Sequence, residues 1–147
     1  MQPISRQRVS EAVAQLMPNV IRGVQLEFFV QRGVTQTQLL VLIAIHAYGR
    51  ATMGRLARSL QVRMPTMTGI VHRLVRAGYV QRASDPEDRR QVVVQLTAKG
   101  RAFIQQFQAL IRRRWAHVLQ VLEPTELEAF YHVVTKLRAQ LQAQTVQ

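Results

Sequence analysis

The feature that most constrains the fold is a change of hydrophobic period after Gly78, in a chain whose other patterns are helical. Residues 79–82 and 91–96, with the sequences YVQR and QVVVQL, are short runs of residue types favoured in β-strands. The polar loop between them, residues 83–90, contains an Asp-Pro turn signal and ends in two arginines. Together these residues predict a β-hairpin with a long basic tip.

Two short helices are expected directly before this hairpin. Thr52 can cap a helix over Met53–Leu60, and Pro65 is tolerated in the first turn of a second helix, which Gly78 closes. The step of residues 60–63 between the two helices is long enough only for a tight turn, so the pair forms a helix-turn-helix. A helix-turn-helix followed by such a hairpin is a winged helix-turn-helix.

A strong helix start precedes this motif at Thr35. Its hydroxyl can cap the free N–H groups of the first turn, and Gln38, three residues on, can reach back to the cap. Val34 can pack against Leu39 as a hydrophobic staple. We expect this helix to run to Tyr48.

The N-terminal flank is predicted to be helical in two parts. Residues 5–16 carry a helical pattern that Pro18 ends or kinks. Residues 19–31 form a second helix, which Gly33 stops and which is apolar on more than one side. Such a helix needs cover from its own core and from a partner chain.

The C-terminal flank is predicted to be two further helices. Thr97 can cap a long helix with apolar residues at helical spacing as far as Leu122, and Pro124 restarts the chain as a last helix with an apolar stripe. We therefore expect a mainly α fold with a small β wing. It is one intertwined domain, in which a winged helix-turn-helix is combined with N- and C-terminal dimerisation helices (35–97, with 1–34 and 98–147).

The positive charge of the chain is concentrated in its central region. The sequence has 20 Lys and Arg against 8 Asp and Glu, a net charge of +12. Residues 50–101 hold eleven basic and three acidic residues, a net charge of +8. A basic block in a sequence that is 48% hydrophobic favours a polyanionic partner, with nucleic acid ahead of an anionic membrane.

Composition and motifs exclude several kinds of chemistry. The chain has no cysteine, which excludes disulfide scaffolds, thiolate nucleophiles and Cys-ligated metals. It has no Gly-rich phosphate loop and no hydrolase or zinc-protease motif, so we expect neither an enzyme nor a cofactor. Glu128 and His132, four residues apart, predict a surface pair rather than a metal site, because His46 and His117 lie elsewhere.

Two further patterns bear on location. Residues 1–13 lack the apolar core of a secretory signal. The longest apolar stretch, residues 39–47, is shorter than the ~20 residues that span a bilayer. We therefore expect a cytoplasmic protein with no membrane partner.

A family resemblance lies mainly between Gly78 and Gly100. With Thr35 to Gln38 and the Leu56-Ala57 pair, this pattern resembles the MarR-type transcription regulators, whose Asp-x-Arg wing signature falls on Asp88 and Arg90. The segments that carry the resemblance are GYVQR at 78–82, DPEDRR at 85–90, VQLT at 94–97 and the glycine at 100.

The resemblance implies that the second helix of the motif enters the major groove by its N-terminus and that the wing enters the minor groove. The first group of candidate DNA-binding residues lies at the start of this recognition helix, and the second lies on the wing. They are Arg63, Pro65, Thr66, Thr68, Gly69, His72 and Arg73, then Arg82, Asp88, Arg89 and Arg90.

Particular roles follow for a few of these residues. We expect Asp88 to hold the Arg90 guanidinium in a bidentate pair without touching DNA. Arg63 stands where the family often has a capping Ser, so a side-chain cap is in question, and Gly69 offers no side chain to a base. His72 is equally a base-contacting residue or a polar surface residue.

The most consistent function is that of a homodimeric, sequence-specific DNA-binding repressor. Two-fold symmetry would set two recognition helices on a pseudo-palindrome with half-site centres about 10 bp apart. The resemblance also implies that a small anionic aromatic effector binds between the dimerisation helices and the winged region. Candidate effector residues are Arg22, Glu27, His46, Tyr48 and Arg113, although Glu27 is equally explained as paired within the dimer.

Two alternatives remain open from the sequence. The basic block also suits an architectural protein that coats DNA without sequence preference. A third, weaker hypothesis is binding to a membrane surface through the basic face. The run Arg112–Arg114 is equally a solvated face, so it does not separate these hypotheses.

Overall fold

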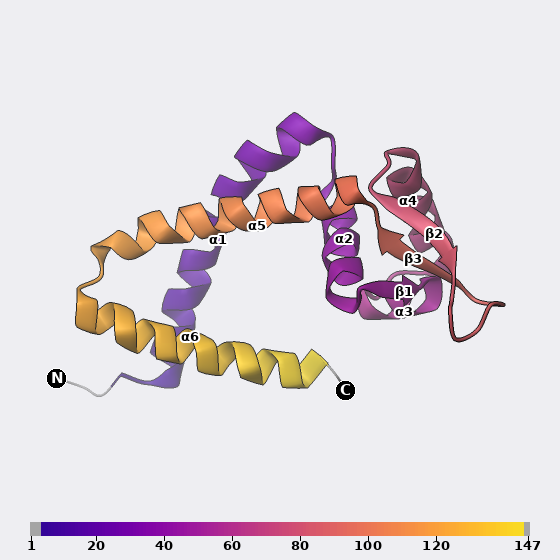
Figure 1. Ribbon diagram of the computed structural model, residues 1–147. Coiled ribbons are helices and arrows are strands. Elements are labelled where there is room, and N and C mark those ends of the chain that lie inside the picture. Colours follow the sequence, from indigo (N-terminus) through magenta and orange to yellow (C-terminus); the bar gives the residue numbers. More distant parts are fainter. Residues whose placement is uncertain (1–3, 146–147) are drawn as a thin grey trace. The chain divides into compact units, whose positions relative to one another are not determined.

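The computed structural model describes residues 4–145, apart from the side chains of 21, 23, 25–27, 30, 31 and 145. The chain divides into two compact units, residues 1–110 and a C-terminal unit of residues 111–147. In chain order (Figure 1), the elements are α1 (Arg6–Arg32), α2 (Gln36–Tyr48), β1 (Arg50–Thr52), α3 (Met53–Ser59), α4 (Met64–Arg76), β2 (Val80–Ser84), β3 (Val92–Leu96), α5 (Ala98–Val118), the 3-10 turn η1 (Leu119–Val121) and α6 (Pro124–Thr145). The predicted mainly α fold with a β wing is confirmed.

Helix α1 differs from the sequence-based prediction. The predicted separate helix over residues 19–31 is wrong, because α1 runs from Arg6 to Arg32 with Pro18 inside it. Proline's fixed φ is helical, and its missing N–H removes one main-chain bond from a helix of 27 residues. The hydroxyl of Ser5 caps the start, and Gly33 ends the helix with a left-handed φ of 61°.

The local helix starts follow the predicted capping chemistry. The N–H of Gln38 donates to the Thr35 hydroxyl at 3.2 Å, and the Gln38 side chain accepts from the N–H of Thr35 at 2.9 Å. Thr52 caps α3 through the N–H of Arg55. Thr97 caps α5 through the N–H of Gly100 at 3.1 Å. These three predicted starts are confirmed.

The sheet has three antiparallel strands in the order β1-β3-β2. The hairpin of β2 and β3 is confirmed, whereas β1 was not predicted. Its central residue, Ala51, pairs with Val94, and Arg82 on β2 pairs with the same residue from the other side. A strand of three residues is too short to show a period, so only its pairing with β3 reveals it.

The core of the winged lobe, residues 35–97, lies between its helices and this sheet. Fully buried side chains come from each layer, so the lobe has a hydrophobic centre of its own. The largest are Leu42 and Ile45 of α2, Leu56 of α3, Met67 and Leu74 of α4 and Val94 of β3. This core fixes one face of α4 inward.

The C-terminal unit has a different character. Helix α5 ends at Val118 and is followed by the 3-10 turn η1, so Leu122, the last residue of the predicted pattern, lies beyond the helix with extended backbone. The rings of Trp115 and Phe130 lie 6.5 Å apart. Of the described side chains of residues 111–144, none is fully buried.

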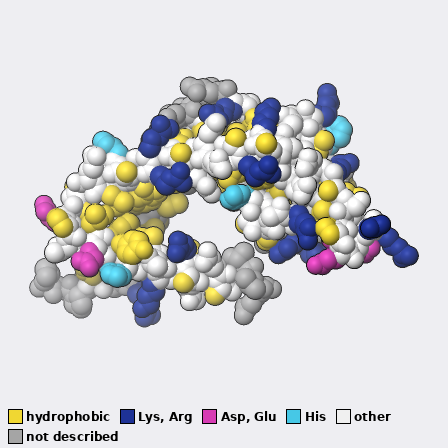
Figure 2. Space-filling model, viewed as in Figure 1, with side chains coloured by type: hydrophobic (Ala, Val, Ile, Leu, Met, Phe, Trp, Pro, Cys, Tyr) yellow, Lys and Arg dark blue, Asp and Glu magenta, His cyan; other side chains and the backbone are white. Residues whose placement is uncertain are grey.

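An apolar stripe lies on the surface of α6 (Figure 2). Its exposed members recur at helical spacing, and part of the stripe forms an open groove of about 340 Å³. The stripe consists of Leu127, Phe130, Val134, Leu137 and Leu141. Within residues 4–145, no helix combines the length and the apolar character needed to cross a membrane.

Candidate nucleic-acid interface

Packing of α4 determines which of its side chains face outward. Met67, Ile70, Val71 and Leu74 are buried, and their spacing places them on one face of the helix. The opposite face carries the predicted recognition residues. Arg63, Pro65, Thr66, Thr68, His72 and Arg73 are exposed, and Gly69 is half-buried.

The N-terminus of α4 carries uncompensated positive charge. Arg63 at the N-cap has extended backbone (φ −71°, ψ 150°) and makes no side-chain capping hydrogen bond. The first turn of α4 contains no acidic residue. The cap that the sequence left in question is therefore absent at Arg63, and this helix end favours an anion such as a DNA phosphate.

Gly69 lies in the middle of the outward face. A Cβ built on it would meet nothing within 4 Å, so no close packing within the protein requires glycine here. The residue instead leaves the helix surface bare between the neighbouring side chains of Thr68 and His72.

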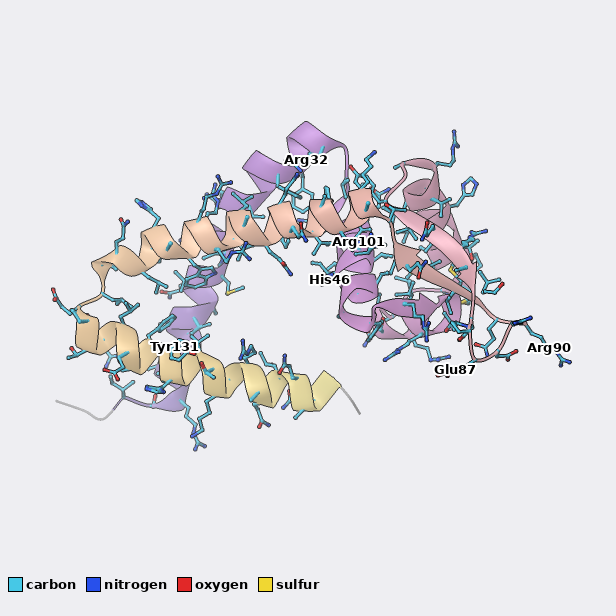
Figure 3. The ribbon with its side chains drawn as sticks, viewed as in Figure 1. Arg32, His46, Glu87, Arg90, Arg101 and Tyr131 are labelled. Carbon is cyan, nitrogen blue, oxygen red and sulfur yellow. The ribbon has the colours of Figure 1, made fainter. Side chains whose placement is uncertain are left out.

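The wing tip is held by hydrogen bonds within the loop. The N–H of Asp85 donates to the carbonyl of Gln91, and the N–H of Gln91 donates to the carbonyl of Asp88, both at 2.9 Å. The N–H of Glu87 donates to the Asp85 carboxylate at 3.0 Å. Arg90 is exposed at the outer end of the loop, with its side chain pointing away from the strands (Figure 3).

Asp88 does not act as the sequence suggested. Its Oδ1 accepts from the main-chain N–H of Arg90 at 3.1 Å, and its Oδ2 accepts from the Gln91 side-chain amide at 3.3 Å. The predicted bidentate pair with the Arg90 guanidinium is therefore replaced by a turn that ties the carboxylate to the main chain. Local side-chain-to-backbone bonds of this kind are favoured by Asp because its carboxylate reaches the N–H two residues on.

The remaining basic side chains of the lobe are also on its surface. Arg82 on β2 and Arg89 in the wing loop are exposed. In Figure 2, dark blue side chains are spread over the part of the view where Figure 1 labels α3, α4 and β2. The exposed cations and the uncapped end of α4 make this lobe a surface suited to a polyanion.

The junction between α4, β2 and α5 contains contacts that sequence reasoning missed. Lys99 Nζ donates to the carbonyl of Ala77 at 2.7 Å and lies 4.6 Å from the centre of the Tyr79 ring. The Thr97 hydroxyl donates to the carbonyl of Gly78 at 2.6 Å. A Cβ on Gly100 would stand 2.1 Å from the carbonyl oxygen of Tyr79. The C-terminal end of α4 is thus fixed to the start of α5.

The predicted effector residues are divided between the two compact units, with Arg113 in the C-terminal unit and the others in residues 1–110. Arg22 and His46 are exposed, and Arg113 is exposed in the C-terminal unit. Tyr48 is half-buried, and the Arg55 guanidinium covers its ring at 3.8 Å from the centre. The side chain of Glu27 lies outside the described residues. Among Arg22, His46 and Tyr48, which share the first unit, no hydrogen bond or ring contact joins one side chain to another. An effector site stays a prediction.

The described side chains do not gather into a metal centre. In the part of the chain that the structure describes, no three His, Asp or Glu side chains come together as a metal site would require. His132 contacts Tyr131, with ring centroids 5.9 Å apart, and lies on the exposed surface of α6.

Comparisons with known proteins point to one family. The MarR family model matches residues 34–92. The HTH-type transcriptional repressor NicR of Pseudomonas putida is 37% identical over 71 residues, which is 48% of this chain and 45% of that repressor. The chain thus spans less than half the length of this curated relative.

Solved structures extend the likeness to nearly the whole chain. Wild-type MarR of E. coli, in its apo form, superposes with a TM-score of 0.68 at 26% identity, covering 93% of this chain and 98% of that one. A mutant of S. aureus MepR bound to an oligodeoxyribonucleotide has a TM-score of 0.69 at 21% identity, covering 90% and 97%. At 21% identity, the likeness to MepR shows a shared fold and nothing more.

Proposed function

Because residues 34–92 match the MarR family model and the fold is that of MarR, we propose that this chain is a winged helix-turn-helix regulator of the MarR type, a sequence-specific double-stranded DNA-binding repressor that acts as a homodimer. The observation that carries this proposal is the outward face of α4. Its polar and cationic side chains lie opposite a fully packed inner face, beside a helix end that no acidic residue neutralises. Such a helix is suited to the major groove.

The wing supports the same function through a different contact. Arg89 and Arg90 are exposed at the tip of a loop whose main chain is fixed by hydrogen bonds. A guanidinium held on a defined loop loses less conformational entropy when it enters a narrow minor groove, where the potential is most negative. We therefore assign recognition of bases to α4 and recognition of groove shape to the wing.

The apolar stripe of α6 supports a homodimer. Leu137 is 57% exposed and Leu141 is 64% exposed. Contact of this much leucine surface with water is energetically unfavourable, so the stripe favours a partner that covers it. A second copy of the chain would cover the same stripe on both subunits by two-fold symmetry. Two winged lobes would then contact a pseudo-palindromic operator with half-site centres about 10 bp apart.

We further propose that a small anionic aromatic effector regulates this dimer. Arg22, His46 and Arg113 offer exposed donors for such a ligand, and Tyr48 offers a ring. The ligand must prefer the arrangement that does not bind DNA, since only a difference in affinity between two states shifts their populations. A repressor of this kind works in the cytoplasm, with DNA as its partner.

Selection from a random duplex pool tests the central part of this proposal. The expected result is a pseudo-palindromic sequence with the half-site spacing given above. Recovery of unrelated sequences, with equal affinity for all of them, would instead support the architectural coating function and refute the operator.

A further inference from the structure

Two threonines on the exposed side of α4 differ in what their hydroxyl groups bind. The Thr68 hydroxyl donates to the main-chain carbonyl of Met64 at 2.9 Å. The Thr66 hydroxyl makes no hydrogen bond to any of the residues 4–145. Both side chains are exposed, so burial does not explain the difference.

The bond to Met64 limits what Thr68 can offer to DNA as a donor. Its hydroxyl proton is already bound within the helix, a back-bond that threonine forms readily. Transferring that proton to a base would exchange one hydrogen bond for another and gain little net free energy. The group that Thr68 can offer at no such cost is its methyl group.

The outward face of α4 is apolar on the N-terminal side of Thr68 and open beside it, and His72 follows one turn later. Met64 precedes it by one helical turn and is 47% exposed, and Pro65 is exposed next to Met64. Gly69, on its other side, leaves open space because nothing lies within 4 Å of an added Cβ. A flat group that carries a methyl could therefore approach Thr68 without displacing a side chain.

We propose that Thr68 is a specificity-determining residue that recognises thymine through its 5-methyl group in the major groove. Thymine differs from the other bases in presenting this methyl on its major-groove edge, where threonine methyl groups make apolar contacts. The inference rests on the proposed DNA-binding function, and it assigns one base identity in each half-site to one side chain.

Replacement of thymine by uracil tests the proposal, because uracil lacks only the 5-methyl group. Each thymine of the selected operator is replaced in turn, and the dissociation constant is measured. At one symmetric pair of positions, the replacement of thymine by uracil is expected to weaken binding by about fourfold per half-site, the effect of one buried methyl group. The other thymines are expected to change binding by much less.

Variants then assign the effect to Thr68. Thr68→Ser keeps the hydroxyl and loses the methyl, so the penalty for uracil should disappear. Thr68→Val keeps the methyl and loses the hydroxyl, so the penalty should remain. Thr66→Ser is the matched control on the same helix, and it should leave the full penalty in place.

Three results would overturn the proposal. A selected operator that tolerates uracil at every position would show that no thymine methyl is recognised, while leaving the DNA-binding function intact. A penalty that survives in Thr68→Ser but disappears in Thr68→Val would assign recognition to the hydroxyl. Failure to select any specific sequence would refute the proposed function and this inference together.

Discussion

The winged lobe and the C-terminal unit use apolar residues in opposite ways. In the winged lobe, α4 buries four side chains against the other helices and the sheet. In the C-terminal unit, α6 carries an apolar stripe of similar spacing, yet none of its described side chains is fully buried. The first region is therefore stabilised by its own core, whereas the second would bury its stripe against another chain in the proposed homodimer.

The largest expected effect concerns the internal packing of the first region. Gly100→Ala places a Cβ against the Tyr79 carbonyl, a main-chain atom that cannot rotate away. We expect the free energy of unfolding to fall by about 3 kcal/mol, as for a severe overpacking substitution. Chemical denaturation measures it. Unchanged stability would show that the α4–α5 junction yields easily.

The second effect concerns the stripe of α6. Leu137→Glu places a charge on this stripe, and we expect the dimer dissociation constant to rise by about 30-fold or more, as for an interface hot spot. Sedimentation equilibrium measures it. Ala139→Glu adds the same charge on the opposite side of α6 and is expected to leave the dimer intact. Equal effects in both variants would contradict an interface on this stripe.

The third effect concerns DNA affinity and its dependence on salt. Arg90→Ala should weaken binding and reduce the slope of log K against log salt by about 0.9 for each phosphate that a subunit no longer neutralises. Titrations at several salt concentrations provide this slope. If both affinity and slope stay at their wild-type values, the wing does not contact DNA.

A smaller effect separates two roles for Asp88. Asp88→Ala removes the acceptor for the Arg90 N–H and should weaken DNA binding by about fivefold, as for one hydrogen bond, although it also removes a negative charge. Asp88→Asn retains an acceptor at the same position and should bind at least as tightly as the wild type. Tighter binding by Asp88→Ala would show that Asp88 merely repels DNA.

The smallest effect concerns the bare position on the outward face of α4. Gly69→Ala adds a Cβ in open space, so we expect a gain of about 0.5 to 1 kcal/mol in the free energy of unfolding, the usual difference between Gly and Ala in a helix. Thermal and chemical denaturation both measure it. A loss of stability would mean that α4 departs from helical geometry at this position.

Features set by neighbouring residues were predictable from the sequence, and contacts between distant residues were not. The capping box at Thr35 depends on a spacing of three, and both of its hydrogen bonds are present. The contact of Lys99 with Ala77 joins residues 22 apart, and β1 exists only through its pairing with β3. No local pattern encodes either contact.

The candidate site shows the same division. The outward face of α4 was predictable because its buried residues recur at helical spacing. The partner of Asp88 was predicted wrongly, since the choice between the Arg90 guanidinium and its N–H depends on the path of the loop. The ring of Tyr48 was assigned to an effector site, and only the structure shows that Arg55 covers it.

The most direct test of base recognition by a homodimer is a ratio of two affinities, one for the selected operator and one for random duplex DNA. Both are measured at the same physiological salt concentration. A homodimer that recognises bases through two α4 helices is expected to show a ratio of about 10³ or more, with two chains in each complex. A ratio near one, whatever the absolute affinity, would contradict base recognition and leave a basic protein that binds DNA by charge alone.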